Sequence, residues 1–192
     1  MKRFLTIFLF CFGAILRLSG QSIPSEDETA LFNKINHYRD SLGLNKLVWD
    51  TSVYKMASHH TKYLCLLNSK NNGKVIKSQL GHTEEVDIAD FEELKTLQDR
   101  GKEFAKDKFV KNRYFSFAEN CCLSTVSKNE KSNIYNSIFK IWLESKKGHK
   151  EIMESKDLIG AACSIKYYFA ELTLESGRTV KLLCVASVLD LY

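Results

Sequence analysis

The order of apolar patterns along the chain constrains its fold more than any other feature. Residues 31–42, the stretch after Asp50 and residues 132–146 repeat apolar side chains at helical spacing. Residues 158–173 and 179–189 are instead rich in Ile, Val, Tyr and Leu, and a short turn-forming segment separates them. Helices that come first and a hairpin that comes last predict an α+β domain in which helices pack on an antiparallel sheet.

Further local signals refine these predictions. Asp50 is a good N-cap for the second helix, and Gly43 and Gly148 lie where the first and third helices are predicted to end. Spaced apolar residues predict another helix over 87–108, and the compact apolar stretch 115–124 is predicted as a strand. The apolar stripes of the three main helices are Leu31, Ile35, Tyr38 and Leu42; Val53, Met56, Ala57, His60, Leu64 and Leu67; and Ile134, Ile138, Ile141 and Trp142.

The first twenty residues have the composition of an export signal. Lys2 and Arg3 precede an apolar run over 4–16, and the small residues Ser19 and Gly20 follow. The run is shorter than the roughly 20 apolar residues that span a bilayer. We therefore predict a secreted or periplasmic protein with no transmembrane segment in the mature chain, divided into a signal peptide (1–20), a leader (21–28) and a single domain (29–192).

Composition supports one globular domain and argues against nucleic-acid binding. The 192 residues are 44% hydrophobic and 27% charged, which is typical of one folded domain. The net charge is +5. Without Lys2, Arg3 and Arg17, 25 basic residues face 23 acidic ones, and the net charge falls to +2. A nearly balanced surface lacks the concentrated basic face that nucleic acid requires, so no nucleic-acid partner is expected.

Five cysteines lie outside the predicted signal, and their pairing is left open. Export permits disulfides, but an odd number leaves at least one thiol unpaired. The neighbours Cys121 and Cys122 point to opposite faces if they lie on a strand. The five are Cys65, Cys121, Cys122, Cys163 and Cys184.

Five short segments carry a family resemblance when they are taken in order. They are 35–50 (INHYRDSLGLNKLVWD), 57–61 (ASHHT), 81–83 (GHT), 118–120 (AEN) and 142–149 (WLESKKGH). Together they resemble the CAP superfamily, also called the SCP domain, in its bacterial branch. The resemblance covers residues 31–189 and implies a three-layer α-β-α sandwich with a central antiparallel sheet. Ala118 departs from the family, which usually has Gly there; Ala tolerates positive φ poorly, so the backbone near Glu119 is predicted to differ from that of its relatives.

The resemblance implies that His82, Glu119 and His149 meet in one surface cleft. Two imidazoles and a carboxylate are ligands that zinc and similar divalent metals accept, and three protein ligands leave one position open. A hydrogen-bonded cluster that pins loops to the helices explains the same residues equally well. Zinc or another divalent metal at His82, Glu119 and His149 is therefore one of two open interpretations.

Ser145 is the fourth predicted cleft residue. Animal and plant members of the family have a second Glu three residues after the Trp, where this chain has Ser145 beside Glu144. Successive helix residues step about 100°, which places Ser145 within about 20° of the Trp142 stripe and Glu144 about 120° from it. Ser145 is therefore expected to line the cleft, and the missing carboxylate should weaken metal binding.

The remaining histidines and nearby acids have simpler interpretations. His60 lies in an apolar stripe and is predicted to be a hydrogen-bonded core histidine. His59 and His37 fall off their stripes and are predicted to face solvent. Glu84 and Glu85 follow His82 closely and are candidates to orient its imidazole, although a charged loop edge explains them as well.

Two functions of different classes fit these residues. The first is a secreted binding module whose cleft holds a lipid or peptide, or which binds an extracellular protein; binding of sterols or fatty acids by some relatives is what the resemblance implies. The alternative is a metal-dependent, protease-like extracellular hydrolase that uses the same cleft. The chain has neither an H-E-x-x-H helix nor a G-x-S-x-G elbow, and a Glu119 that binds metal cannot also be the general base. No catalytic residue is assigned, and the sequence favours binding.

Overall fold

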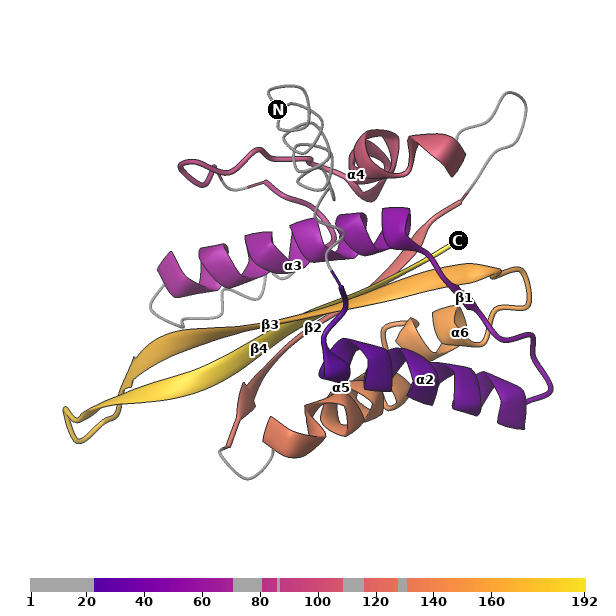
Figure 1. The fold of residues 1–192 in the computed structure, drawn as a ribbon. Coiled ribbons are helices and arrows are strands. Elements are labelled where there is room, and N and C mark those ends of the chain that lie inside the picture. Colours follow the sequence, from indigo (N-terminus) through magenta and orange to yellow (C-terminus); the bar gives the residue numbers. More distant parts are fainter. Residues whose placement is uncertain (1–22, 71–80, 86, 109–115, 128–130) are drawn as a thin grey trace, which may run out of the picture.

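A four-stranded sheet lies between two layers of helices in the computed structural model, which describes residues 23–70, 81–85, 87–108, 116–127 and 131–192. Helix α3 (Thr51–Lys70) covers one face of the sheet, and α4 (Leu97–Phe104) packs on α3 from outside (Figure 1). Helices α2 (Glu26–Ser41), α5 (Ile134–Leu143) and α6 (His149–Met153) cover the other face. The expected three-layer α-β-α sandwich is confirmed.

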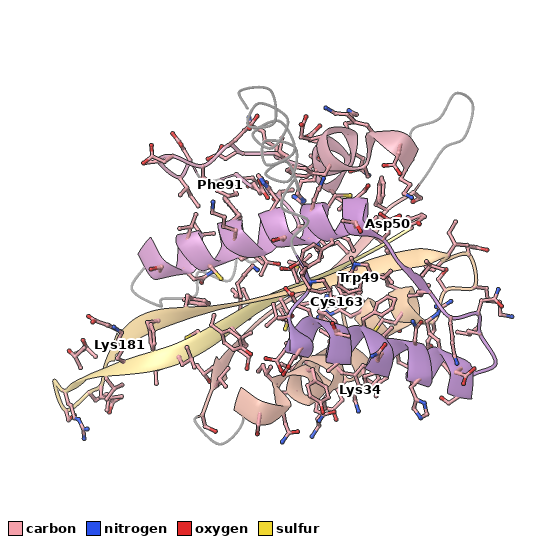
Figure 2. The ribbon with its side chains drawn as sticks, in the orientation of Figure 1. Lys34, Trp49, Asp50, Phe91, Cys163 and Lys181 are labelled. Atoms are coloured by element: carbon pink, nitrogen blue, oxygen red, sulfur yellow. The ribbon has the colours of Figure 1, made fainter. Side chains whose placement is uncertain are left out.

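The sheet has the strand order β1-β3-β4-β2. Strands β3 (Gly160–Thr173) and β4 (Thr179–Leu191) form the predicted C-terminal hairpin, and β2 (Ala118–Val126) pairs antiparallel with β4. The two-residue β1 (Val48–Trp49) runs parallel to β3, so the sheet is antiparallel except at this edge. The far end of the hairpin, where Figure 2 labels Lys181, projects beyond the helices.

Helix α2 begins earlier than the sequence analysis expected. Ser25 and Glu28 form a capping box, so the helix starts at Glu26, inside the stretch assigned to a leader. The buried Glu28 carboxylate also accepts hydrogen bonds from Ile165 N (2.9 Å) and Tyr54 Oη (3.1 Å). Residues 26–28 therefore belong to the packed domain. The predicted signal peptide lies outside the described residues and stays a prediction.

The predicted helix over 87–108 is largely wrong. Only α4 and a short 3-10 turn (Lys106–Lys108) are helical there, and the described residues before Leu97 are irregular. Their backbone groups bond elsewhere: Leu94 N donates to Glu84 Oε2 (2.8 Å). Phe91 packs against Tyr63 of α3 at a ring-centroid distance of 5.9 Å (Figure 2). Contact with α3, rather than an i to i+4 stripe, explains the spaced apolar residues.

The apolar core is divided by the sheet. One large cluster fills the space between the sheet and helices α2 and α5, and it includes the fully buried Trp142 and Cys163. Two smaller clusters lie on the α3 side, around Leu64 and Val53. Among the described residues, no helix combines the length and apolarity needed to cross a membrane.

Candidate functional site

A pocket of about 280 Å³ lies where α3, β2 and the α5–α6 connection meet. His82, Ser145 and His149 line it, whereas Glu119 is buried behind His82 and does not. The structure thus gathers three of the four predicted cleft residues around one cavity and places the fourth directly behind it. The lining residues are Leu64, Gly81, His82, Cys121, Cys122, Leu123, Ile141, Ser145, Lys147 and His149.

His82 is held by Glu119. Its Nδ1 lies 2.8 Å from Glu119 Oε2, and the His82 side chain is 53% exposed while that of Glu119 is 1% exposed. A carboxylate only accepts hydrogen bonds, so His82 carries its hydrogen on Nδ1. The other ring nitrogen, Nε2, is therefore the one that His82 offers to a ligand.

Arg100 neutralises the carboxylate behind His82, and sequence reasoning missed it. Its guanidinium is fully buried and donates to Glu119 Oε1 (2.6 Å) and to the His82 carbonyl (3.2 Å). Burial opposes the charge of Arg100, but the nearby carboxylates outweigh it and raise the pKa of Arg100. An arginine in a short charged helix carries no local signal of burial.

Glu84 does not orient His82, which corrects the sequence-based suggestion. Its buried carboxylate instead accepts from His59 Nε2 (3.2 Å) and His60 Nδ1 (3.0 Å). Burial opposes ionisation, but these hydrogen bonds prevail and lower the pKa of Glu84 to about 2. Glu85 accepts from the Thr83 hydroxyl (3.0 Å) instead.

The remaining histidine predictions have mixed outcomes. His60 is fully buried and hydrogen-bonded through both ring nitrogens, and His37 is exposed, as predicted. His59 was predicted to face solvent, but its side chain is only 14% exposed. Its ring packs against Phe91 and Phe104 at centroid distances of 4.6 and 5.2 Å, because the irregular segment and α4 cover it.

His149 has an unused ring nitrogen beside the pocket. Its Nδ1 is buried and has no hydrogen-bond partner among the described residues. Burial, and then repulsion from His82, lower the pKa of His149, which keeps the ring neutral. Asn120 Nδ2 donates to the His149 carbonyl (3.0 Å) and ties the start of α6 to β2.

Ser145 reaches the pocket for a different reason from the one predicted. Helix α5 ends at Leu143 rather than near residue 146, so the helical step does not apply to Ser145. The chain turns after Glu144, and Ser145 Oγ accepts from Lys147 N (3.2 Å). Glu144 is exposed and pairs with Lys140 (3.8 Å), so it stays away from the pocket.

The strand around Glu119 is regular. Ala118, which stands where the family usually has Gly, pairs with Leu191 as extended backbone, so no positive φ is needed. Cys121 lies on the same face as Glu119, and Cys122 points to the opposite face, where its Sγ is 3.1 Å from Ser187 Oγ. The five cysteines are free thiols in the structure.

Comparison with known proteins identifies the family. The model of the cysteine-rich secretory protein family, CAP, matches residues 32–171. The chain belongs to this family. No curated protein sequence matches it significantly.

Three solved structures resemble this CAP domain at low identity. An outer surface protein from Borrelia burgdorferi is 18% identical, with 87% of this chain and 92% of that chain covered and a TM-score of 0.45. An extracellular SCP-domain protein from Bacillus anthracis is 17% identical, with 84% of this chain and 39% of that chain covered and a TM-score of 0.45. A cysteine-rich secretory protein from Staphylococcus aureus is 12% identical (88% and 39% covered, TM-score 0.41). The CAP domain thus spans 39% of the length of the last two.

The donor set at the pocket fits a divalent metal only in part. One Glu119 oxygen accepts from Arg100 and the other from His82, so Glu119 supports His82 from behind. The nitrogens left for an ion in the pocket are Nε2 of His82 and a ring nitrogen of His149. Two imidazoles fit zinc, and the other positions would fall to solvent or to a bound ligand.

The buried carboxylates of this CAP domain predict loss of stability in acid. The pKa of Glu84 is lowered, so its stabilisation is present above the ordinary carboxyl pKa of about 4.3 and is lost as pH falls towards 2. We expect the urea midpoint to drop over this window, with Glu84 accounting for roughly 2–3 kcal/mol. The Glu84→Gln variant should be less stable at pH 7 and should show a flatter pH dependence.

Glu144→Gln is the matched control, because Glu144 is exposed. Asp190 acts in the opposite direction: burial raises its pKa, so it destabilises the fold once the unfolded chain ionises above about pH 4. An unchanged pH slope in Glu84→Gln would contradict the assignment of the acid effect to Glu84.

Proposed function

We propose that this CAP protein is an exported binding module whose pocket holds a small amphipathic ligand, a lipid or peptide that carries an acidic group. The supporting observation is the pair of imidazoles, His82 and His149, that line one cavity. Leu64, Leu123 and Ile141 supply an apolar wall beside them. A mostly apolar cavity with a few polar groups is the usual form of a small-molecule site.

The charge of the pocket supports an anionic group on the ligand. None of the described residues that line it is acidic, and Lys147 contributes a cation. The nearest carboxylate, Glu119, is already neutralised by Arg100 and covered by His82. A carboxylate head near Lys147 and the imidazoles would gain charge-assisted hydrogen bonds, while a short chain lies on the apolar wall.

The groups of the pocket support binding over hydrolysis. Burial opposes the charge of Glu119, but attraction to His60, His82 and Arg100 lowers its pKa, which makes it a weak base. Burial raises the pKa of the Cys121 thiol well above its usual value, which makes it a poor nucleophile. The Ser145 hydroxyl is engaged by the Lys147 amide.

A divalent metal is compatible with this proposal. His82 and His149 would hold it, with Glu119 orienting His82, and the ion would supply a Lewis acid for the carboxylate of the ligand.

Titration calorimetry with decanoate and decanol, each with and without zinc, tests the proposed function. We expect the protein to bind decanoate and to bind decanol at least tenfold more weakly, because only the acid pairs with the basic groups of the pocket. The His149→Ala and Lys147→Ala variants should each weaken decanoate binding about tenfold, the effect of one lost charge-assisted hydrogen bond.

Lys150→Ala is the matched control, because Lys150 is the next lysine along the chain, pairs with Glu154 (3.7 Å) and does not line the pocket. Decanoate that fails to bind, or binds equally well to the His149 and Lys147 variants, would rule out this pocket as the site. Dependence of decanoate affinity on zinc would add the metal to the binding function.

A further inference from the structure

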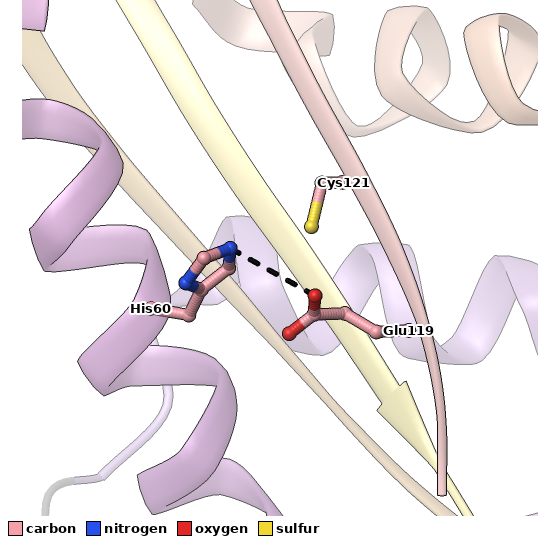
Figure 3. A group of neighbouring side chains, drawn as sticks. All are labelled: His60, Glu119 and Cys121. Carbon is pink, nitrogen blue, oxygen red and sulfur yellow. Dashed lines mark ion pairs between the residues drawn. The ribbon is translucent and has the colours of Figure 1, made fainter. Parts of the chain in front are cut away.

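We propose that this protein has an inner metal site, formed by His60 Nε2, Glu119 Oε2 and Cys121 Sγ. Glu119 Oε2 has two lone pairs, so it can bind an ion while it still accepts the hydrogen bond from His82. Figure 3 shows the three side chains converging, His60 from α3 and the other two from β2. Their ligand atoms lie within 4.8 Å of one another, and Nε2 is 3.8 Å from Oε2. Tetrahedral zinc with bonds of about 2.0–2.3 Å separates its ligand atoms by roughly 3.3–3.8 Å, so a small contraction forms the site.

His60 is oriented as a metal-binding imidazole usually is. Its Nδ1 donates to the Glu84 carboxylate (3.0 Å), which directs Nε2 towards Glu119. A carboxylate behind the imidazole is the arrangement that fixes metal-bound histidines. Nε2 also lies 3.0 Å from the Gly81 carbonyl, a contact that an ion bound to Nε2 would replace. On binding, the ion would displace the thiol proton of Cys121 to solvent.

Asp190 is a buried polar group without a hydrogen-bond partner beside the proposed inner site. It lies opposite Glu119 in the β2–β4 pair, is fully buried, and neither carboxyl oxygen makes a hydrogen bond of normal geometry with the described residues. Buried polar groups without partners usually mark a water or ion. A bound ion, with the water that it carries, would give the Asp190 carboxyl the partner that it lacks among the described residues.

The inner site differs from the pocket in ligands and in metal preference. It uses no atom of His149, and it adds a thiol, which favours zinc or a softer metal over calcium or magnesium. Cys121 connects the two regions, because it also lines the pocket and its Sγ lies 3.7 Å from His82 Nδ1. The pocket therefore gives an ion a route from solvent to the inner site.

Cobalt titration followed by absorption spectroscopy tests the inner site. Cobalt replaces zinc in such sites, and a thiolate ligand produces a near-ultraviolet charge-transfer band. We expect one equivalent of cobalt to develop this band and one equivalent of zinc to remove it. The Cys121→Ser variant should lose the band, and His60→Gln should bind cobalt about 10- to 100-fold more weakly.

Two variants serve as controls. Cys122→Ser removes the neighbouring thiol on the opposite face, and His149→Ala removes the pocket imidazole, so both should keep the band. A folded protein without a thiolate band, or a band that survives in Cys121→Ser, would overturn the inner site. Far-ultraviolet circular dichroism checks folding, and Cys121→Ala replaces Cys121→Ser if the serine variant unfolds. Decanoate binding reports on the pocket separately, so the two proposals fail independently.

Discussion

Replacing Arg100 with alanine should destabilise the protein by about 3–5 kcal/mol, one of the two largest effects expected of a single substitution. The guanidinium is fully buried, lies 2.6 Å from Glu119 and is 3.5 Å from Glu84. Its removal leaves two carboxylates in the interior without their cation, and an uncompensated buried charge costs about this much. Urea unfolding at pH 7, followed by circular dichroism, measures the loss.

Lys102→Ala is the control for Arg100→Ala. Lys102 lies on the same helix, but it is 69% exposed and pairs with the partly exposed Asp99 at 3.8 Å. Surface pairs of this kind contribute roughly 0–1 kcal/mol. At pH 3 the penalty of Arg100→Ala should shrink, because the stranded carboxyls become protonated. A loss of less than about 1 kcal/mol for Arg100→Ala would show that the carboxylates are hydrated or neutral.

Replacing Trp142 with alanine should destabilise the protein by a similar amount, about 3–5 kcal/mol, for an apolar reason. Trp142 is fully buried in the cluster between the sheet and helices α2 and α5. Truncating a large buried aromatic residue removes its transfer free energy and leaves a cavity that the surroundings fill only in part. The urea midpoint, followed by circular dichroism, should fall at every pH because no charge is involved.

Lys140→Ala is the control on the same helix, since its side chain is 72% exposed. We expect this variant to change stability by less than about 0.5 kcal/mol. Trp142→Ala and Lys140→Ala both place alanine on α5, so the difference between their stabilities measures core packing rather than helix propensity. If the Trp142→Ala protein were as stable as the Lys140→Ala protein, packing of the Trp142 face of α5 against the sheet would not contribute to stability.

The elements that the sequence predicted correctly are those with a local signal. The stripe through Leu31 and Ile35, the N-cap Asp50 and the turn with Gly177 each act within a few residues, and the structure has α2, α3 and the β3–β4 hairpin at those places. The prediction of a helix over the irregular stretch before α4 is wrong. Its Phe91 packs against α3, and sequence spacing alone does not distinguish that contact from a helical stripe.

The order of the sequence motifs predicted which residues form the candidate site. Their positions relative to one another could be seen only in the folded structure. The structure places His82, Ser145 and His149 around one pocket and Glu119 behind His82. Their metal or ligand role stays a prediction. Ser145 reached its place through a turn after α5, and a helical step can describe only residues that remain on the helix.

By itself, the sequence determined the family, the main helices, the C-terminal hairpin and the histidines to consider. Only the tertiary structure decided which ionisable groups are buried together: Arg100, Glu84, Glu119 and Asp190 meet from one helix, one loop and two strands. The physical reason is that periodicity is a property of neighbouring residues, whereas a buried charge is tolerated only when a partner from elsewhere in the chain compensates it. A lone arginine or aspartate in a sequence resembles a surface residue until packing supplies that partner.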